Sequence, residues 1–449
     1  MVYKNKKEIL RTGKIKVEGN YFKVKDIPYF KKNILPNLVN TIILSESKTL
    51  KRFCYQLAYN CGLSLGIYPA SIQALYKACG RKEAGGFCVP AINLRTLTFE
   101  LAQTVFEVAK KINSNLFIFE IAKSEIGYTW QSPQEYSALI TLAAIKQGYK
   151  GPLFFQGDHF QTEIKKYKND FTQHIKDLKK LIKEAIEAGF YNIDIDSSTL
   201  VDLSKKDLYA QQELNYKTCA YFTKYLRRIQ PRGIDVSIGG EIGEIGGANS
   251  KPAELDTFMR GYLEEIGSRE GISKISVQAG TKHGGVVLPD GSIAKVKIDF
   301  ETLNKLSKIA KDKYKLAGAV QHGASTLPNQ AFHHFPKQGC IEIHLATQFQ
   351  NIIYDYMPLP LKEKIYSWLD KNFYKERQKD WTDDQFIYKL RKKALGPFKK
   401  EIYQLPADLK DKIKSVLKEE FSFLFDKLNL KNTKKIVNKY IKGGHHEIR

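Results

Sequence analysis

The feature that most constrains the fold is a regular alternation of apolar, β-rich runs with longer segments whose apolar residues recur at helical spacing. Eight such units follow one another between about residues 71 and 355. Their strands read as near-continuous apolar runs, as expected when both faces of a strand are covered. We therefore predict an α/β fold, a (β/α)₈ TIM barrel. The expected strands are 85–93, 115–122, 152–159, 191–198, 234–243, 272–280, 315–323 and 339–347.

A doubly wound open sheet is the alternative fold, but it does not account for polar residues at the carboxyl ends of nearly all the strands. In a barrel those ends form the active-site face. The barrel, 71–355, is preceded by an N-terminal extension, 1–70. It is followed by a charged, helical C-terminal extension, 356–449, which we expect to pack on the barrel or to form a subunit interface.

Three histidines each follow an expected strand: His159 in FFQGDHF, His283 in AGTKHGG and His322 in AVQHGAST. A single histidine in this position is more often an ordinary loop residue. Three on the same face predict a metal centre, because three imidazoles form a zinc set that leaves the fourth position for water or substrate.

Carboxylates accompany these histidines at the same strand ends. Asp158 directly precedes His159, Asp196 ends NIDID, and Glu241 ends SIGGE. A divalent ion with carboxylates beside it can polarise a carbonyl while one carboxylate moves protons. The set therefore suits chemistry on a carbon next to a carbonyl better than it suits a structural zinc site.

Charge and composition narrow the classes of partner. The formal net charge is +24, but the lysines are scattered along helices among acidic residues, and no run combines basic with aromatic residues in the manner of a stacking platform. We expect no nucleic-acid partner, whereas a positive field would attract an anionic substrate such as a sugar phosphate. The six cysteines form no CxxC pair, the N-terminus lacks an apolar signal region, and no stretch is apolar enough to span a membrane. We expect reduced thiols, a cytoplasmic location and no membrane partner.

Together these motifs resemble the class II, zinc-dependent fructose-bisphosphate aldolase family, which includes tagatose-bisphosphate aldolases. The resemblance covers residues 71–355, and its motifs are GFCVPAIN, QGDHF, IDSS, GGEIGEIGG, TKHGG and QHGAS. By resemblance, Asp158 is the catalytic acid/base, and His159, His283 and His322 bind Zn²⁺. Asp196 and Glu241 face the metal site. The substrate side consists by resemblance of Asn93, Gly284, Gly323, Ser325 and Thr347, of which the glycine amides and Ser325 would hold a phosphate.

The sequence also departs from the family pattern. Ala248 and Asn249 stand where the family usually has a mobile-loop glutamate that takes part in proton transfer. At strand eight the family usually has an asparagine, an aspartate and a threonine, and this chain has His344, Ala346 and Thr347. His344 is interpreted either as a substrate contact or as a packed strand-end histidine.

The resemblance implies a metal-dependent aldolase of carbohydrate metabolism and glycolysis, acting on fructose 1,6-bisphosphate or a similar ketose bisphosphate. It also implies a homo-oligomer, a dimer or tetramer. Two alternatives stay open: an aldolase of the same mechanism for a different sugar phosphate, and a non-catalytic subunit like that of the tagatose-bisphosphate aldolase system.

Overall fold

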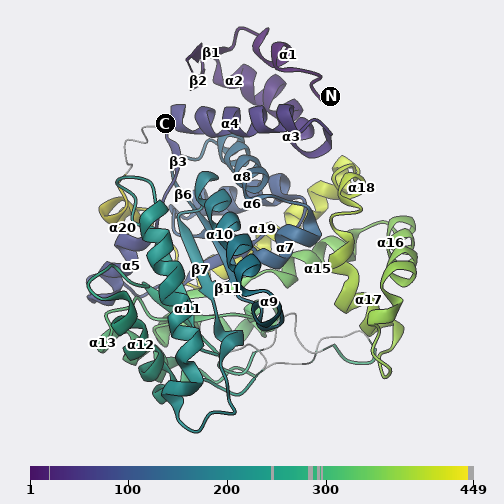
Figure 1. Ribbon diagram of the computed structural model, residues 1–449. Helices are drawn as coiled ribbons and strands as arrows, with labels where there is room; N and C mark the ends of the chain where they lie inside the picture. The colour runs from purple at the N-terminus through teal and green to yellow at the C-terminus, as the bar shows by residue number, and fades with distance from the viewer. Residues whose placement is uncertain (20, 244–246, 282–286, 291–293, 295–296, 443–449) are drawn as a thin grey trace.

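The computed structural model describes residues 1–442 apart from 20, 244–246, 282–286, 291–293 and 295–296. Eight parallel strands lie at its centre (Figure 1). They are β4 (Val89–Asn93), β5 (Ile118–Ala122), β6 (Gly151–Gln161), β7 (Asn192–Asp196), β8 (Ser237–Glu241), β9 (Lys274–Val277), β10 (Ala319–Gln321) and β11 (Glu342–Leu345). Consecutive strands pair in the order β4 to β11, and β11 pairs with β4, so the sheet closes. The predicted (β/α)₈ barrel is confirmed.

Every predicted strand corresponds to one of these eight, although most of the strands are shorter than predicted. The seventh was expected over 315–323 and is found over Ala319–Gln321. The backbone limits it, because Gly318 has a φ of +143° and Gly323 has a φ of +67°. Both values lie in the region that glycine adopts more readily than other residues, so the chain leaves the extended conformation on either side.

Charged side chains lie inside the barrel. The prediction of the strands as apolar runs did not include these charges. Lys274, only 1% exposed, places its Nζ 2.9 Å from Asp194 Oδ1, 2.5 Å from Glu342 Oε1 and 2.8 Å from Gln156 Oε1. These residues come from β9, β7, β11 and β6. Gly239 on β8 provides the space, because a Cβ there would overlap the Asp194 carboxylate.

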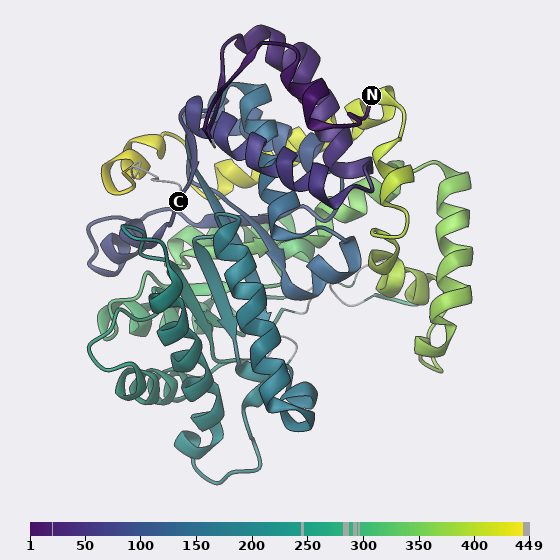
Figure 2. The same cartoon turned by 45° about the horizontal axis from the view of Figure 1, so that its top comes forward.

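Helices surround the strands and connect each strand to the next along the chain (Figure 2). Their apolar faces pack on the sheet, and most of their lysines face solvent. In chain order they are α6 (Thr98–Lys111), α7 (Lys123–Thr129), α8 (Pro133–Gln147), α9 (Ile164–Asn169), α10 (Phe171–Glu187), α11 (Leu208–Ile229), α12 (Pro252–Ile266), α13 (Phe300–Asp312), α14 (His334–Lys337) and α15 (Thr347–Tyr356). Short 3-10 turns are η2 (Ser198–Leu200), η3 (Ala324–Thr326) and η4 (Asn329–Ala331).

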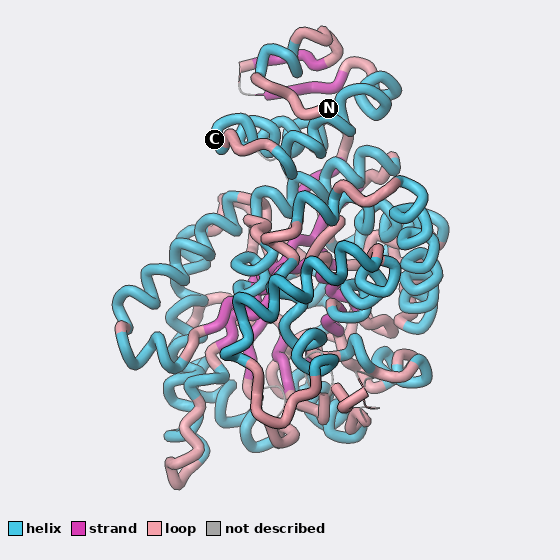
Figure 3. The backbone as a smooth tube through the Cα atoms, turned by 90° about the vertical axis from the view of Figure 1, so that its right-hand side faces the viewer, coloured by secondary structure: helices cyan, strands magenta, loops and turns pink. Residues whose placement is uncertain are grey.

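The N-terminal segment forms a cap at one end of the barrel, and its hairpin lies well away from the central strands (Figure 3). Its long helix packs on α8, and its last strand pairs with the start of β6. Its elements are α1 (Lys6–Leu10), β1 (Ile15–Glu18), β2 (Tyr21–Val24), α2 (Ile27–Tyr29), the π-helix η1 (Phe30–Ile34), α3 (Leu35–Leu44), α4 (Lys48–Ser64), β3 (Ile67–Pro69) and, leading into the barrel, α5 (Gln73–Gly80).

The C-terminal segment is helical, as expected, and returns to the barrel. It comprises α16 (Leu359–Phe373), η5 (Tyr374–Glu376), α17 (Asp383–Leu390), η6 (Arg391–Ala394), α18 (Lys399–Tyr403), α19 (Ala407–Lys427) and α20 (Lys434–Tyr440). Helix α19 packs against α6 and α15. Its Phe425 also stacks on Phe117, just before β5, with ring centroids 5.8 Å apart. Among the helices the structure describes, none has the length and apolar character needed to cross a membrane.

Candidate active site

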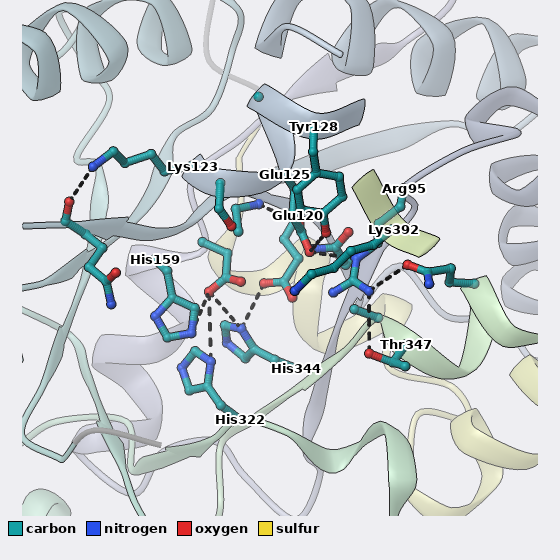
Figure 4. Close-up of a pocket in the computed structure, with 18 of the residues that line it drawn as sticks. Arg95, Glu120, Lys123, Glu125, Tyr128, His159, His322, His344, Thr347 and Lys392 are labelled. Atoms are coloured by element: carbon teal, nitrogen blue, oxygen red, sulfur yellow. Dashed lines mark hydrogen bonds and ion pairs between the residues drawn. The ribbon is translucent and has the colours of Figure 1, made fainter. Parts of the chain in front are cut away.

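A pocket of about 670 Å³ opens at the carboxyl ends of the barrel strands. Its walls come from β4, β5, β6 and β11, from the turn that follows β10, from helices α7 and α15, and from α17 and η6 of the C-terminal segment. Histidines gather on one side of it, and basic side chains from two distant parts of the chain on the other (Figure 4). Because strand ends in a barrel converge on one face, residues far apart in sequence meet here.

The carboxyl end of β6 holds Asp158 and His159 in an irregular stretch of strand. The register between β6 and β7 shifts between Gly157 and Phe160, as in a β-bulge. His159 lies within that shift and has a φ of +41°, a conformation that costs energy for any residue other than glycine. The bulge re-aims side chains that would otherwise alternate across the sheet, and both Asp158 and His159 line the pocket.

Two carboxylates hold the His159 ring. Nδ1 of His159 lies 2.9 Å from Asp196 Oδ2 and 3.4 Å from Glu241 Oε2. Burial opposes protonation of His159, but Asp158 and Glu241 outweigh it and raise the pKa of the imidazole well above its usual value. Burial, together with Asp196, raises the pKa of Glu241 to about 8. The site therefore has a strongly negative potential, which favours a bound cation.

Three imidazoles lie in a row in this negative region, each tilted relative to the next. The ring centroids of His159 and His322 are 4.3 Å apart, and those of His322 and His344 are 4.0 Å apart. One oxygen of Asp158, Oδ1, faces all three: it lies 3.9 Å from His159 Nε2, 3.9 Å from His322 Nδ1 and 3.2 Å from His344 Nδ1. The other nitrogen of His322 lies 3.0 Å from the hydroxyl of Ser276.

The donor set fits a metal such as zinc, whose protein ligands are imidazole nitrogen, thiolate and carboxylate oxygen. Ligand atoms of His159, Glu241 and His322 all lie within 4.8 Å of one another, as do those of Asp158, His322 and His344. Two of the three predicted histidine ligands are therefore adjacent. The third, His283, lies outside the described residues, so its position stays a prediction.

Asp196 is adjacent to the predicted ligands but bonds to His159. Its carboxylate accepts hydrogen bonds from Ser198 Oγ at 2.7 Å and from Gln161 Nε2 at 2.6 Å, besides its contact with His159. Burial raises the pKa of Asp196, but these bonds outweigh it and lower the pKa below its usual value. An ionised Asp196 fixes which nitrogen of His159 carries its proton, and so aims the other nitrogen toward the pocket.

The predicted substrate side lies across the pocket from His159. Gly323, Ser325 and Thr347 all line it, and Gly284 lies outside the described residues. Ser325 Oγ accepts backbone hydrogen bonds from Ala346 at 2.8 Å and from Thr347 at 3.2 Å, which ties the end of β10 to the start of α15.

Asn93, at the end of β4, is 1% exposed and donates its amide protons to Glu125. Within the described chain its Oδ1 has no hydrogen-bond partner, although it is buried at the pocket wall. A buried acceptor of this kind is costly unless a ligand satisfies it. The position of Asn93 therefore suits its predicted contact with substrate.

His344 lines the pocket, and carboxylates hold both of its ring nitrogens, so both interpretations of His344 stay predictions. Its Nδ1 lies 3.0 Å from Glu120 Oε2, and its Nε2 lies 2.8 Å from Glu342 Oε1. Burial opposes protonation, but Glu120 and Asp158 raise the pKa of His344 well above its usual value. Glu120 was not predicted, although it stands between apolar neighbours in FIFEIA, and such a polar residue within an apolar strand indicates a position that faces the barrel interior.

Two basic residues of the pocket were also missed. Arg95 follows β4 and is paired with Glu125, with Nε 2.7 Å from Oε1. Lys392 comes from η6, far later in the chain, and lines the same pocket. No local pattern links two such distant residues, so only the folded chain brings them together.

A family model matches most of the chain. It is the model described as fructose-bisphosphate aldolase class-II, and it matches residues 73–421. Comparison with curated proteins gives no significant match.

Solved structures resemble this chain at low sequence identity. The fructuronate-tagaturonate epimerase UxaE from Cohnella laeviribosi is 12% identical, with a TM-score of 0.58 over 84% of this chain and 86% of that one. The YdjI aldolase from Escherichia coli K12 is 15% identical, with a TM-score of 0.49 over 81% and 98%. The fructose-bisphosphate aldolase from Campylobacter jejuni is 19% identical, with a TM-score of 0.49 over 82% and 96%.

Proposed function

Because this chain belongs to the class-II fructose-bisphosphate aldolase family, we propose that it is a metal-dependent aldolase. It would cleave a ketose bisphosphate, fructose 1,6-bisphosphate or a similar sugar, into dihydroxyacetone phosphate and an aldehyde. One observation carries the proposal: a single oxygen of Asp158 lies within 3.9 Å of the imidazole nitrogens of His159, His322 and His344, inside a pocket at the carboxyl ends of the strands.

His159, His283 and His322 would hold zinc, with Glu241 and Asp196 beside them. When bound there, the ion supplies a Lewis acid that polarises the ketone and stabilises negative charge on its oxygen. The negative potential around His159 and the adjacent donor atoms of Glu241 and His322 support this assignment.

Asp158 would act as the base. It takes the proton from the hydroxyl on the carbon whose bond to the ketone fragment breaks, and that carbon becomes the aldehyde. The electron pair of the broken bond passes to the ketone fragment, which then takes up a proton at carbon. Glu241 would return that proton. In the synthetic direction the same steps run in reverse.

Other residues would position the substrate. Asn93 Oδ1 offers a buried acceptor for a sugar hydroxyl, and Ser325, Thr347, Gly323 and Gly284 would hold a phosphate. Asp196 fixes the His159 ring, so replacing Asp196 would misplace a metal ligand rather than remove one.

A second candidate is an aldolase of the same mechanism for a different sugar phosphate. It is favoured by the end of β11, where His344 and Ala346 replace the usual asparagine and aspartate and where His344 contacts Glu120. A non-catalytic role is favoured by the missing loop glutamate. Asn249, at that position, instead donates a hydrogen bond to Asp299 at 3.0 Å.

The test is cleavage of fructose 1,6-bisphosphate, coupled to detection of triose phosphate, before and after chelation and zinc addition. We expect chelation to abolish activity and zinc to restore it. His322→Ala should reduce kcat/KM by more than about 100-fold, the scale of losing a group that stabilises the transition state. His333→Ala is the matched control, because His333 lies outside the pocket lining.

The metal content of the purified protein separates the alternatives. Bound zinc without cleavage would favour a different sugar phosphate, and absence of both zinc and cleavage would contradict the aldolase proposal. The homo-oligomeric state, the cytoplasmic location and a role in glycolysis stay predictions.

A further inference from the structure

The side of the pocket opposite the histidines carries a buried arginine. The Arg95 side chain is 13% exposed. Its Nη1 donates to Gln350 Oε1 at 2.9 Å and lies 3.5 Å from Thr347 Oγ1, and its Nε pairs with Glu125. These bonds use Nε and Nη1. Within the described chain they leave the Nη2 amino group of the guanidinium to a ligand.

Lys392 brings a second positive charge to the same place. Its Nζ lies 5.9 Å from the centre of the Tyr128 ring, and Tyr128 also lines the pocket. Burial and the charge of Arg95 lower the pKa of Lys392. Among the described residues Lys392 forms no ion pair, so its charge is available to the pocket.

The segment that carries Lys392 is fixed on both sides. Arg391 donates to Asn351 Oδ1 at 2.7 Å, and its backbone oxygen accepts a bond from Tyr354 at 2.7 Å, which ties η6 to α15. Gly396 donates its amide to the backbone oxygen of Tyr128 at 2.9 Å, and a Cβ at Gly396 would lie 2.7 Å from that oxygen. The position of Lys392 is therefore set by packing.

Two other lysines of the pocket share one carboxylate. Lys123 and Lys166 both lie within 2.9 Å of Glu163 Oε1. Among the described residues, Glu125 is the one acid that forms an ion pair with Arg95 or Lys392. The end of the pocket that carries these two cations therefore has an excess of positive charge, which suits an anion.

Neutral donors lie beside the two cations. The Ser325 hydroxyl oxygen accepts hydrogen bonds from two backbone amides, so its own hydroxyl proton points away from them. Thr347 Oγ1 faces Arg95. The amides at the start of α15, a helix of ten residues, add to the positive potential. An arginine, a lysine and two hydroxyls together match the several acceptor oxygens of a phosphate.

We propose that Arg95 and Lys392 bind a phosphate group of the substrate, together with Ser325 and Thr347. The C-terminal segment is then part of the substrate site, because it supplies Lys392. This inference rests on the proposed function for the identity of the substrate, but binding of the phosphate group can be measured without turnover.

The first experiment is calorimetric titration of inorganic phosphate into the full-length protein and into Lys392→Gln at constant ionic strength. We expect Lys392→Gln to weaken binding roughly tenfold, the effect of losing one hydrogen bond to a charged group. The control is Lys393→Gln, since Lys393 lies on the same turn but pairs with Glu376 at 2.5 Å outside the pocket. A second variant, Arg95→Lys, keeps the charge near buried Glu125 and should also weaken binding.

The second experiment is steady-state kinetics. Lys392→Gln should raise KM for the sugar bisphosphate with little change in kcat, because the contact is made equally in the ground and transition states. Unchanged phosphate affinity in both Lys392→Gln and Arg95→Lys would overturn the inference. Weakened phosphate binding in a protein that cleaves no sugar bisphosphate would support the inference while contradicting the proposed function.

Discussion

Replacing Lys274 with methionine removes the ammonium group that three barrel residues share. Its three protons meet three acceptors, on Asp194, Glu342 and Gln156, at 2.5–3.0 Å. Methionine fills a similar volume but leaves the two buried carboxylates with only His344 as a cationic neighbour. Removing one partner of a buried ion pair typically costs about 3–5 kcal/mol, and we expect a loss of this size.

The loss should depend on pH. Burial raises the pKa of Glu342, but Lys274 and His344 outweigh it and lower that pKa to about 2; burial raises the pKa of Asp194 to about 6. Without Lys274, we expect the folded-state pKa of Glu342 to rise above its value in the unfolded chain, and the pKa of Asp194, which is already raised, to rise further. A group whose pKa is raised on folding loses its contribution to stability as pH rises, so the variant should be destabilised more at about pH 8 than at about pH 5.

The assay is unfolding in guanidinium chloride at both pH values, with the free energy of unfolding taken from midpoint and slope. Lys305→Met is the matched control, since Lys305 makes an exposed i,i+4 pair with Glu301 and should leave stability nearly unchanged. A loss below about 1 kcal/mol for Lys274→Met at the higher pH, or a loss that does not grow with pH, would refute the reasoning.

Three further predictions concern the site and the core. His344→Asn should lower kcat by roughly tenfold or more, measured in the coupled assay, because Asp158 loses its closest imidazole; an unchanged kcat would make His344 a packing residue. Gly239→Ala should reduce the free energy of unfolding by about 1–3 kcal/mol, because the new Cβ would overlap the Asp194 carboxylate. An unchanged free energy of unfolding would show that Asp194 and Lys274 can move aside. All six thiols are buried, and burial raises the pKa of Cys54 to about 12. A disulfide reagent should therefore label the native protein slowly and the unfolded protein at six sites. Rapid labelling of the native protein would contradict the burial of the thiols.

The barrel could be predicted because each strand is an apolar run and each connection has helical periodicity, so eight local signals agree. The same patterns placed Asp158, His159 and His322 at strand ends that converge. Strand limits were predicted less well, because they depend on backbone conformations such as that of Gly318, which apolar patterning does not register. The three-residue strand β3 was missed for a related reason, since IYP is too short for any pattern.

Lys392 and the barrel interior were missed for different reasons. Lys392 looks like any other surface lysine in sequence, and only the packing of η6 against α15 and α7 gives it a role. The interior charges did leave a signal. In NIDID, KISV and IEIH, polar and apolar residues alternate, and strict alternation in a barrel strand indicates that one set faces inward. Since Lys274 and Glu342 come from such strands, period-two alternation within an otherwise apolar run predicts a charged barrel interior. His344 connects this interior to the pocket, because it contacts both Glu342 and Asp158, the proposed base.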